Sequence, residues 1–230
     1  MFVHHAFTRN PYSDVMKKIF AEFLGTSLLV GIVVGSGIMA TNLSEDVGVQ
    51  LSINTISTVF GLYVLIQILG PISGAHFNPV VTLIEFIQRR TSALAFIQYL
   101  VAQVLGAISG AVIANAMFSH PLFETATKVR GGGNQYLGEI IATAGLILLI
   151  NLMLAQVKTP LIPVTVAAWI GSAYFFTSST SFANPAVTIG RIFSDSFAGI
   201  APGCAPKFIA AQILGALIGL GLTKVLTSDK

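Results

Sequence analysis

The stretch SFANPAVTIGRIF at residues 181–193 repeats the pattern of an earlier one, HFNPVVTLIEF at residues 76–86. In each, an Asn-Pro pair opens a short apolar segment. Asn is a favoured N-cap residue, because its side-chain oxygen accepts a hydrogen bond from an N–H of the first helical turn. Proline is tolerated at the first helical position, since the N–H that it lacks would have no partner there. The two pairs therefore predict two short helices that begin at Pro79 and Pro185.

The composition is that of an integral membrane protein. Of 230 residues, 54% are hydrophobic and 9% are charged, whereas a soluble domain carries about 25% charged residues. A mean hydropathy of +0.82 is too high for a chain that hides its apolar side chains in one core. The net charge is only +3, and no basic cluster with interleaved aromatic residues indicates nucleic-acid binding. The single cysteine, Cys204, excludes an intrachain disulfide and a cysteine-based metal site.

Six stretches are long and apolar enough to cross a membrane, which takes about 20 residues. The segments that follow the Asn-Pro pairs are too short to span and are typical of re-entrant half-helices. We therefore expect an all-α polytopic membrane protein with six transmembrane helices and two re-entrant half-helices. The expected spans are residues 17–41, 51–69, 92–118, 135–157, 161–176 and 205–226, and the half-helices are residues 78–88 and 184–194.

Three motifs recur in the same order, which indicates an internal repeat. A Glu-x-x-x-Thr motif begins at Glu22 and again at Glu139, the Asn-Pro segments match, and Ala-Gln-x-x-Gly recurs in the third and sixth spans. We assign repeat 1 to about residues 17–118, the connecting loop to 119–134 and repeat 2 to about 135–227, all within a single transmembrane domain of residues 1–230. Because each repeat has an odd number of spans, the second copy is inverted in the membrane.

Inversion makes the two half-helices enter from opposite faces, so that their N-termini meet near the middle of the bilayer. Each helix N-terminus carries roughly half a positive elementary charge, and Asn78 and Asn184 add amide N–H donors at that point. Residues 70–76 and 177–183, before the two turns, are rich in Gly, Ser and Thr, as suits backbone that lines a wet cavity. The pattern predicts a narrow pore that opposes cations and suits small neutral molecules with hydroxyl groups.

These motifs resemble the aquaporin, or major intrinsic protein, family. SGAHFNPVVT and SFANPAVT resemble its paired NPA boxes, here Asn78-Pro79-Val80 and Asn184-Pro185-Ala186, with Val80 in place of the usual alanine. The resemblance covers residues 17–227 and implies a passive channel for water and small neutral solutes, a homotetramer, no cofactor and no enzymatic activity. The downstream combination FANPAVTIGR, SD and FAGIAP resembles a bacterial branch often associated with arsenic-resistance genes. That branch implies polyols and neutral metalloid hydroxides such as arsenite as solutes.

The family resemblance also implies a filter at one end of the pore, usually with an arginine three residues after the second Asn. That position is Val187 here, and the other filter positions map to Thr58, Ser172 and Ser181, with Phe60 as the alternative to Thr58. Because Thr, Ser and Val are small, we expect a wide filter that passes small uncharged solutes as well as water.

Arg191 leaves one alternative open. It lies four residues beyond Val187, which on a helix is one turn further on nearly the same face. Its guanidinium either reaches back to the pore mouth, where it could restore a strict water filter, or it snorkels or pairs with Asp195.

The ionisable residues within the apolar segments have two interpretations. The family resemblance implies that Glu22 and Glu139 brace the two re-entrant loops and that His76 lines a vestibule. A proton relay through the glutamates, or packing of His76 in the protein interior, is the alternative. A secondary transporter would need such groups for ion coupling, and it is the less favoured function.

Charge placement predicts the orientation. Lysines and arginines gather at the loops on one side, and the positive-inside rule places that side and both termini in the cytoplasm. We expect a multi-pass protein of a bacterial plasma membrane, surrounded by lipid. The residues concerned are Arg9, Lys17, Lys18, Arg89, Arg90, Lys158, Lys224 and Lys230.

Overall fold

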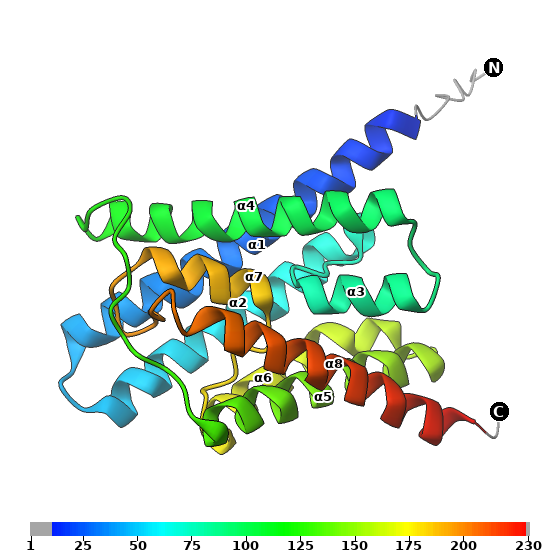
Figure 1. Ribbon diagram of the computed structural model, residues 1–230. Coiled ribbons are helices and arrows are strands. Elements are labelled where there is room, and N and C mark those ends of the chain that lie inside the picture. The colour runs from blue at the N-terminus through cyan, green and yellow to red at the C-terminus, as the bar shows by residue number, and fades with distance from the viewer. Residues whose placement is uncertain (1–10, 229–230) are drawn as a thin grey trace.

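The computed structural model describes residues 11–228, so the ends of the expected domain, with Arg9 and Lys230, lie outside the description. All of the described secondary structure is helical, and Figure 1 shows it as one bundle. The first repeat contains α1 (Pro11–Leu43), α2 (Val47–Ser73), α3 (Pro79–Ile87) and α4 (Ala93–Met117). The second contains α5 (Gly133–Ala155), the 3-10 turn η1 (Thr159–Leu161), α6 (Ile162–Phe176), α7 (Pro185–Gly190), the 3-10 turn η2 (Arg191–Phe193) and α8 (Ala205–Thr227).

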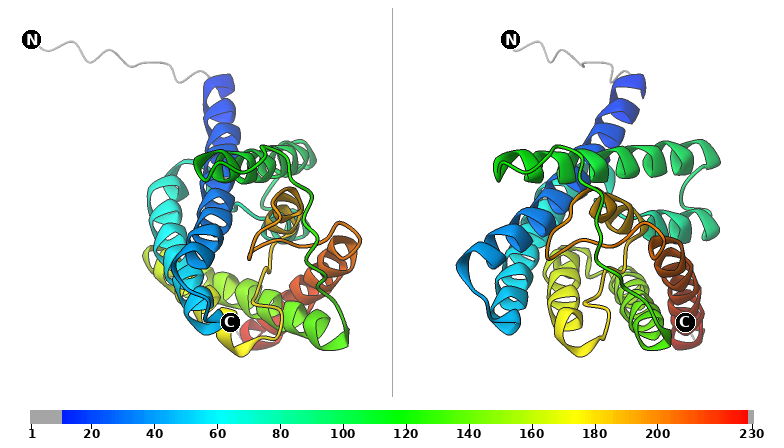
Figure 2. Two further views of the ribbon diagram at one scale, coloured as in Figure 1. Left: turned by 90° about the vertical axis from the view of Figure 1, so that its left-hand side faces the viewer. Right: turned by 60° about the vertical axis from the view of Figure 1, so that its left-hand side comes forward.

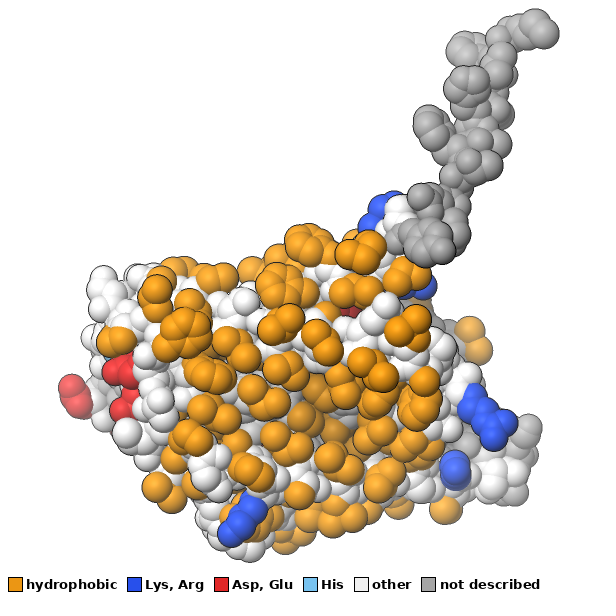
Figure 3. Space-filling view, turned by 45° about the horizontal axis from the view of Figure 1, so that its top comes forward, with side chains coloured by type: hydrophobic (Ala, Val, Ile, Leu, Met, Phe, Trp, Pro, Cys, Tyr) orange, Lys and Arg blue, Asp and Glu red, His pale blue; other side chains and the backbone are white. Residues whose placement is uncertain are grey.

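The predicted fold class is confirmed. Within the described residues, six helices are long and apolar enough to cross a membrane: α1, α2, α4, α5, α8 and the η1–α6 segment. Hydrophobic side chains cover the middle of the face in Figure 3, and the charged side chains lie toward its ends. This distribution is the one that a bilayer requires, because burying a charged side chain at its centre is costly.

Glycines set the crossings of α1 with α4 and of α5 with α8. A Cβ atom at Gly110 would lie 2.2 Å from the carbonyl oxygen of Ser27, and one at Gly219 would lie 2.4 Å from that of Ala144. The helix backbones therefore touch, as small residues allow in membrane proteins. The two crossings are equivalent positions of the two repeats.

The half-helices α3 and α7 begin at Pro79 and Pro185, where the sequence pattern predicts them. The second one is shorter than expected as an α-helix, because it ends at Gly190 and continues as the 3-10 turn η2. Figure 2 shows α7 among the long helices, and α3 packs against α4 and α8. Their position leaves the two Asn residues in the interior, away from lipid.

The N-terminal start of α1 and the C-terminal end of α8 lie at the same end of the bundle (Figure 1). The loop between α4 and α5 and the segment between η2 and α8 lie at the opposite end. Backbone hydrogen bonds join the α4–α5 loop to η2, from Ala126 N to Ile192 O at 2.8 Å, and to the segment after η2, from Ala201 N to Lys128 O at 2.8 Å.

Candidate functional site

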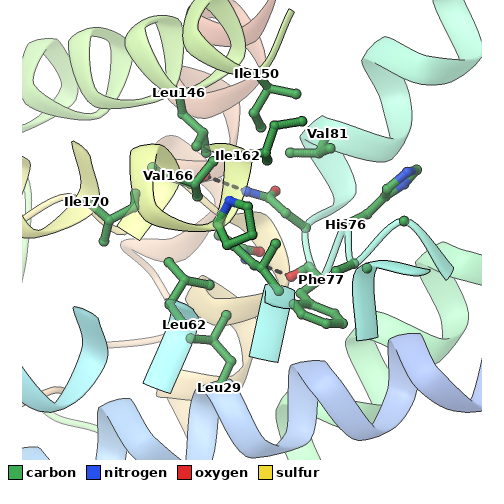
Figure 4. A pocket seen from close by; sticks show the side chains of 18 of the residues that line it. Leu29, Leu62, His76, Phe77, Val81, Leu146, Ile150, Ile162, Val166 and Ile170 are labelled. Atoms are coloured by element: carbon green, nitrogen blue, oxygen red, sulfur yellow. Dashed lines mark hydrogen bonds between the residues drawn. The ribbon is translucent and has the colours of Figure 1, made fainter. Parts of the chain in front are cut away.

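A cavity of about 490 Å³ runs between the two repeats. Hydrophobic side chains from α1, α2, α5 and α6 converge on it (Figure 4). The opposite wall is formed by the two loops that precede α3 and α7. One side of the cavity is therefore apolar and the other carries the backbone groups of the loops. The labelled apolar residues on these four helices are Leu29, Leu62, Leu146, Ile150, Ile162, Val166 and Ile170.

Asn78 and Asn184 both line this cavity, and each side chain forms two kinds of hydrogen bond. Oδ1 of Asn78 accepts from Val80 N at 3.1 Å, and Oδ1 of Asn184 accepts from Ala186 N at 2.9 Å, so each caps its own half-helix. Nδ2 of each donates to the other half: Asn78 to Ala183 O and Asn184 to Phe77 O, both at 2.8 Å. Since an amide group has two N–H donors, each Asn keeps one for a molecule in the cavity.

The loops adopt the same backbone conformation in both repeats. Ala75 and Phe77 before Asn78, and Ser181 and Ala183 before Asn184, have φ between 47° and 51°. Such left-handed conformations are uncommon for residues other than glycine and are often found at functional sites. The two repeats therefore match in their backbone φ angles as well as in their sequence motifs.

Two buried carboxylates hold these loops. Glu22 accepts from the backbone N of His76 at 3.0 Å and of Phe77 at 2.8 Å. Glu139 accepts from the backbone N of Phe182 and of Ala183, both at 2.9 Å. Both carboxylates are wholly buried, and hydrogen bonds to a charged acceptor are among the stronger ones. This geometry fits the bracing role that the resemblance implies.

Two glutamines extend this bracing, although sequence reasoning assigned them no role. Gln103 Nε2 donates to Glu22 at 2.8 Å and to Thr82 Oγ1 at 3.0 Å. Gln212 Nε2 donates to Glu139 at 2.6 Å and to Thr188 Oγ1 at 2.9 Å. The repeated Ala-Gln-x-x-Gly motif is the sequence feature that could have identified these glutamines. Each glutamine ties a spanning helix to both the loop and the half-helix of its repeat.

Val80 and Ala186, which follow the two Asn-Pro pairs, are buried and lie outside the cavity lining. Val80 packs in a cluster with Ile84, Ile147 and Leu220. The substitution of Val for the usual alanine is thus accommodated behind α3 and leaves the cavity unchanged at this point.

The end of the cavity reached by α7, which we call the arginine mouth, is lined by Thr58, Tyr174, Ser181, Val187 and Arg191. Arg191 is 2% exposed and donates from Nε to Ala198 O, and its guanidinium carbon lies 3.4 Å from the ring centroid of Phe182. The Tyr174 hydroxyl donates to Thr58 Oγ1 at 3.2 Å. Arg191 therefore faces the cavity, and it forms no ion pair with Asp195 among the described residues.

Two of the expected filter residues lie elsewhere. Phe60 is 66% exposed and outside the cavity lining, whereas Thr58 belongs to it. Ser172 is exposed and also outside the lining, in contrast to the expectation from spacing. The α6 residues on either side of Ser172 that line the cavity are Ile170 and Tyr174, one turn apart, and a position midway between them points to the other side of the helix. Sequence reasoning missed Tyr174 because the rotation of α6 has no local signal.

The opposite end of the cavity, which we call the histidine mouth, contains His76 and Glu85. His76 Nδ1 lies 3.0 Å from Thr82 Oγ1, and its ring meets Tyr99 edge to face at 5.3 Å. Glu85 pairs with Arg90 at 2.8 Å. Across residues 11–228, no three His, Cys, Asp or Glu side chains gather as a metal site would require.

Comparisons with known proteins identify the same family that the sequence motifs resemble. The family model described as "Major intrinsic protein" matches residues 10–179. The chain is 46% identical to aquaglyceroporin AqpS of Rhizobium meliloti (strain 1021), over 92% of this chain and 90% of the relative. It is 30% identical to aquaporin TIP1-1 of Arabidopsis thaliana, over 77% of this chain and 75% of that one. The solved aquaglyceroporin of Plasmodium falciparum superposes with a TM-score of 0.67 over 93% of this chain and 98% of its own, at 19% identity, which speaks for the fold alone.

Proposed function

Because this chain belongs to the major intrinsic protein family, whose members are channels and not enzymes, we propose that it is a passive channel for water and small uncharged solutes. A relative that shares 46% of its residues and is named an aquaglyceroporin supports this class of solute. The cavity of about 490 Å³ with two amide donors at its centre is the observation that carries the proposal.

The proposed filter is the arginine mouth. Its hydrogen-bonding groups are the Arg191 guanidinium, the Ser181 hydroxyl and the Thr58–Tyr174 pair, and Val187 supplies an apolar surface. Ser181 belongs to the cavity lining, and its Oγ is buried and has no hydrogen-bond partner among the described residues. A molecule with hydroxyls on one side and carbon on the other fits such a surface. Small polyols and neutral metalloid hydroxides such as arsenite, which also presents hydroxyl groups, share these features.

Ions are poor substrates for this cavity. The N-termini of α3 and α7 point to its centre, where their partial positive charge opposes cations. Apolar side chains line much of the passage, and burying an unpaired charge among them is expensive. We therefore expect the proposed channel to conduct no ions.

We also propose the orientation and assembly. Both described chain ends lie at one end of the bundle, together with the loops that carry Arg89, Arg90 and Lys158, and the positive-inside rule makes that end cytoplasmic. The arginine mouth then opens outside the plasma membrane of a bacterium. A homotetramer follows from the family resemblance, although each chain contains a complete cavity of its own.

The second candidate is a strict water channel. It is favoured by the position of Arg191, whose buried guanidinium faces the cavity and supplies donors that the usual arginine position, Val187, lacks. The wide filter is preferred because Val187 and Ser181 leave room beside that guanidinium.

Stopped-flow light scattering on proteoliposomes separates the two candidates. We expect rapid uptake of water, glycerol and arsenite that rises linearly with solute concentration. Rapid water passage with rejection of glycerol and arsenite would contradict the wide filter, and saturating solute uptake would instead indicate a carrier. An Arg191→Ala variant with an unchanged preference among the solutes would remove Arg191 from the filter.

A further inference from the structure

Three cationic side chains meet beside the arginine mouth, on three consecutive backbone carbonyls. Lys128 Nζ donates to Phe197 O at 2.9 Å, and Arg130 donates to Phe197 O at 3.1 Å and to Gly199 O at 2.8 Å. Arg191 donates to the carbonyl between them, that of Ala198. Phe182 packs against two of the three, with the guanidinium carbon of Arg130 5.1 Å from its ring centroid.

The three cations outnumber the carboxylates close to them, which are Asp195 and Glu139. Within the described residues none of the three cations forms an ion pair. Asp195, the nearest acid along the chain, accepts from the backbone N and the hydroxyl of Thr127. Glu139 is occupied by backbone N–H groups and Gln212. The arginine mouth therefore carries a net positive charge.

Burial lowers the pKa of both loop residues, and the neighbouring cations lower the pKa of Lys128 further. Burial, together with repulsion by Arg130 and Arg191, lowers the pKa of Lys128 to about 8. Burial likewise lowers the pKa of Arg130 to about 10, against a smaller opposing effect of Glu139. A nearby anion would relieve the repulsion, because opposite charges favour the charged form of a group.

Arg191 retains most of its hydrogen-bonding capacity. A guanidinium has five N–H donors, and the one hydrogen bond that the structure records for Arg191 within residues 11–228 uses Nε. The four donors on its terminal nitrogens belong to a side chain that lines the same cavity as Ser181, whose hydroxyl is buried and has no hydrogen-bond partner among the described residues. A planar fork of this kind matches the oxygens of a carboxylate, phosphate or sulfate.

We propose that the arginine mouth binds a small oxyanion through Arg191 and Ser181, in the field of Lys128 and Arg130, and that the bound anion closes the channel. An oxyanion held there does not cross, because the passage beyond is lined by apolar side chains and Glu85 lies at the histidine mouth. The blocking part rests on the proposed channel function, whereas the binding part does not.

Calorimetric titration of purified protein in detergent with sodium sulfate tests the binding part. Sulfate keeps its charge between pH 7 and 9, and sodium chloride holds the ionic strength constant. We expect saturable binding that Arg191→Lys weakens at least tenfold, because an ammonium group cannot reproduce the two-pronged contact. Lys128→Gln should weaken it about fivefold through loss of one nearby charge.

A matched control is available on the same face of the molecule. Lys207 is an exposed lysine at the start of α8, and Lys207→Gln removes the same charge away from the three carbonyls. It should leave sulfate binding unchanged. If the Lys207 and Lys128 variants lost sulfate affinity equally, the effect would be due to general surface charge, and the proposed site would be wrong.

A pH series adds an independent readout. The charged groups around Lys128 are Arg130 on its own segment, Arg191 on η2 and Asp195 beside Thr127. Between pH 7 and 9 Lys128 loses its proton, so sulfate binding should weaken in the wild type, while Lys128→Gln should show none of that change. A pH response of equal size in both proteins would contradict the assignment.

Flux measurements in proteoliposomes then test closure. Sulfate at saturating concentration on both sides should reduce glycerol uptake several-fold in the wild type, and much less in Arg191→Lys. Absence of binding together with normal glycerol uptake overturns the anion site and leaves the channel intact. Sulfate binding without any solute or water uptake supports the anion site and contradicts the proposed function.

Discussion

At the scale of single residues, we propose that Val187 and Arg191 together form the part of the filter for which the family resemblance implies one arginine. Val187 holds the usual position with a small apolar side chain, and Arg191 lines the same mouth from one turn beyond. The guanidinium of Arg191 donates a hydrogen bond to Ala198 O and packs over the ring of Phe182. The arginine mouth therefore contains the hydrogen-bond donors of Arg191, and the small side chain of Val187 leaves space beside them.

Returning the arginine to the usual position should narrow the pore. In Val187→Arg we expect glycerol uptake to fall on the order of tenfold, equivalent to about 1.4 kcal/mol in the barrier, because a second guanidinium occupies the open side of the filter. Water uptake should fall less, since water needs less room. Stopped-flow light scattering measures both, and Val187→Leu serves as the control for added bulk without charge. Equal losses of water and glycerol in Val187→Arg would refute the filter role of this position.

At the scale of elements, the close crossings of α1 with α4 and α5 with α8 anchor the two half-helices. The helices that cross also carry Glu22 and Gln103 in one repeat, and Glu139 and Gln212 in the other. Because those side chains hold the loops, a small shift of a crossing would move the loops and the Asn residues at the centre.

Two glycines of α8 make this testable. A Cβ at Gly219 would lie 2.4 Å from Ala144 O, whereas a Cβ at Gly221 meets nothing within 4 Å. We expect Gly219→Ala to destabilise the protein by about 1–3 kcal/mol through overpacking. Gly221→Ala should be neutral or slightly stabilising, since alanine favours a helix by up to about 1 kcal/mol over glycine. Thermal unfolding in detergent compares the two, and equal melting temperatures would show that this crossing tolerates a methyl group.

At the scale of the whole molecule, the inverted repeat explains why the cavity is symmetric at its centre and asymmetric at its mouths. Asn78 and Asn184 occupy equivalent positions and bind each other's loops. One turn beyond the two valines, however, the repeats carry Glu85 and Arg191. The backbone is duplicated, but the side chains at these two equivalent positions carry opposite charges, so the two mouths can differ in what they bind.

The proposed orientation has a direct test. A fluorescent protein fused after Lys230 should fluoresce and alkaline phosphatase fused there should be inactive, because we expect the C-terminus to be cytoplasmic. Phosphatase inserted in the exposed part of the α4–α5 loop should show the reverse behaviour and serves as the control. An active phosphatase at the C-terminus would show that the two mouths open on the opposite sides of the membrane from those proposed.

The class of protein, the six spans, the half-helices and the inverted repeat could be predicted from the sequence alone. Each depends on a local property: the length of an apolar run, the capping chemistry of Asn-Pro, or the order of repeated motifs. The pairing of Glu22 and Glu139 with the loops was expected from the family resemblance, and the hydrogen bonds of both carboxylates fit it.

Only the tertiary structure decided which side chains face the cavity. The choice of Thr58 over Phe60 and of Tyr174 over Ser172 depends on how far α2 and α6 are rotated about their axes. That rotation results from packing against helices distant in sequence, so no short pattern encodes it. The gathering of Lys128 and Arg130 beside Arg191 has the same origin, because a loop from between the repeats meets the segment after η2 only in the folded protein.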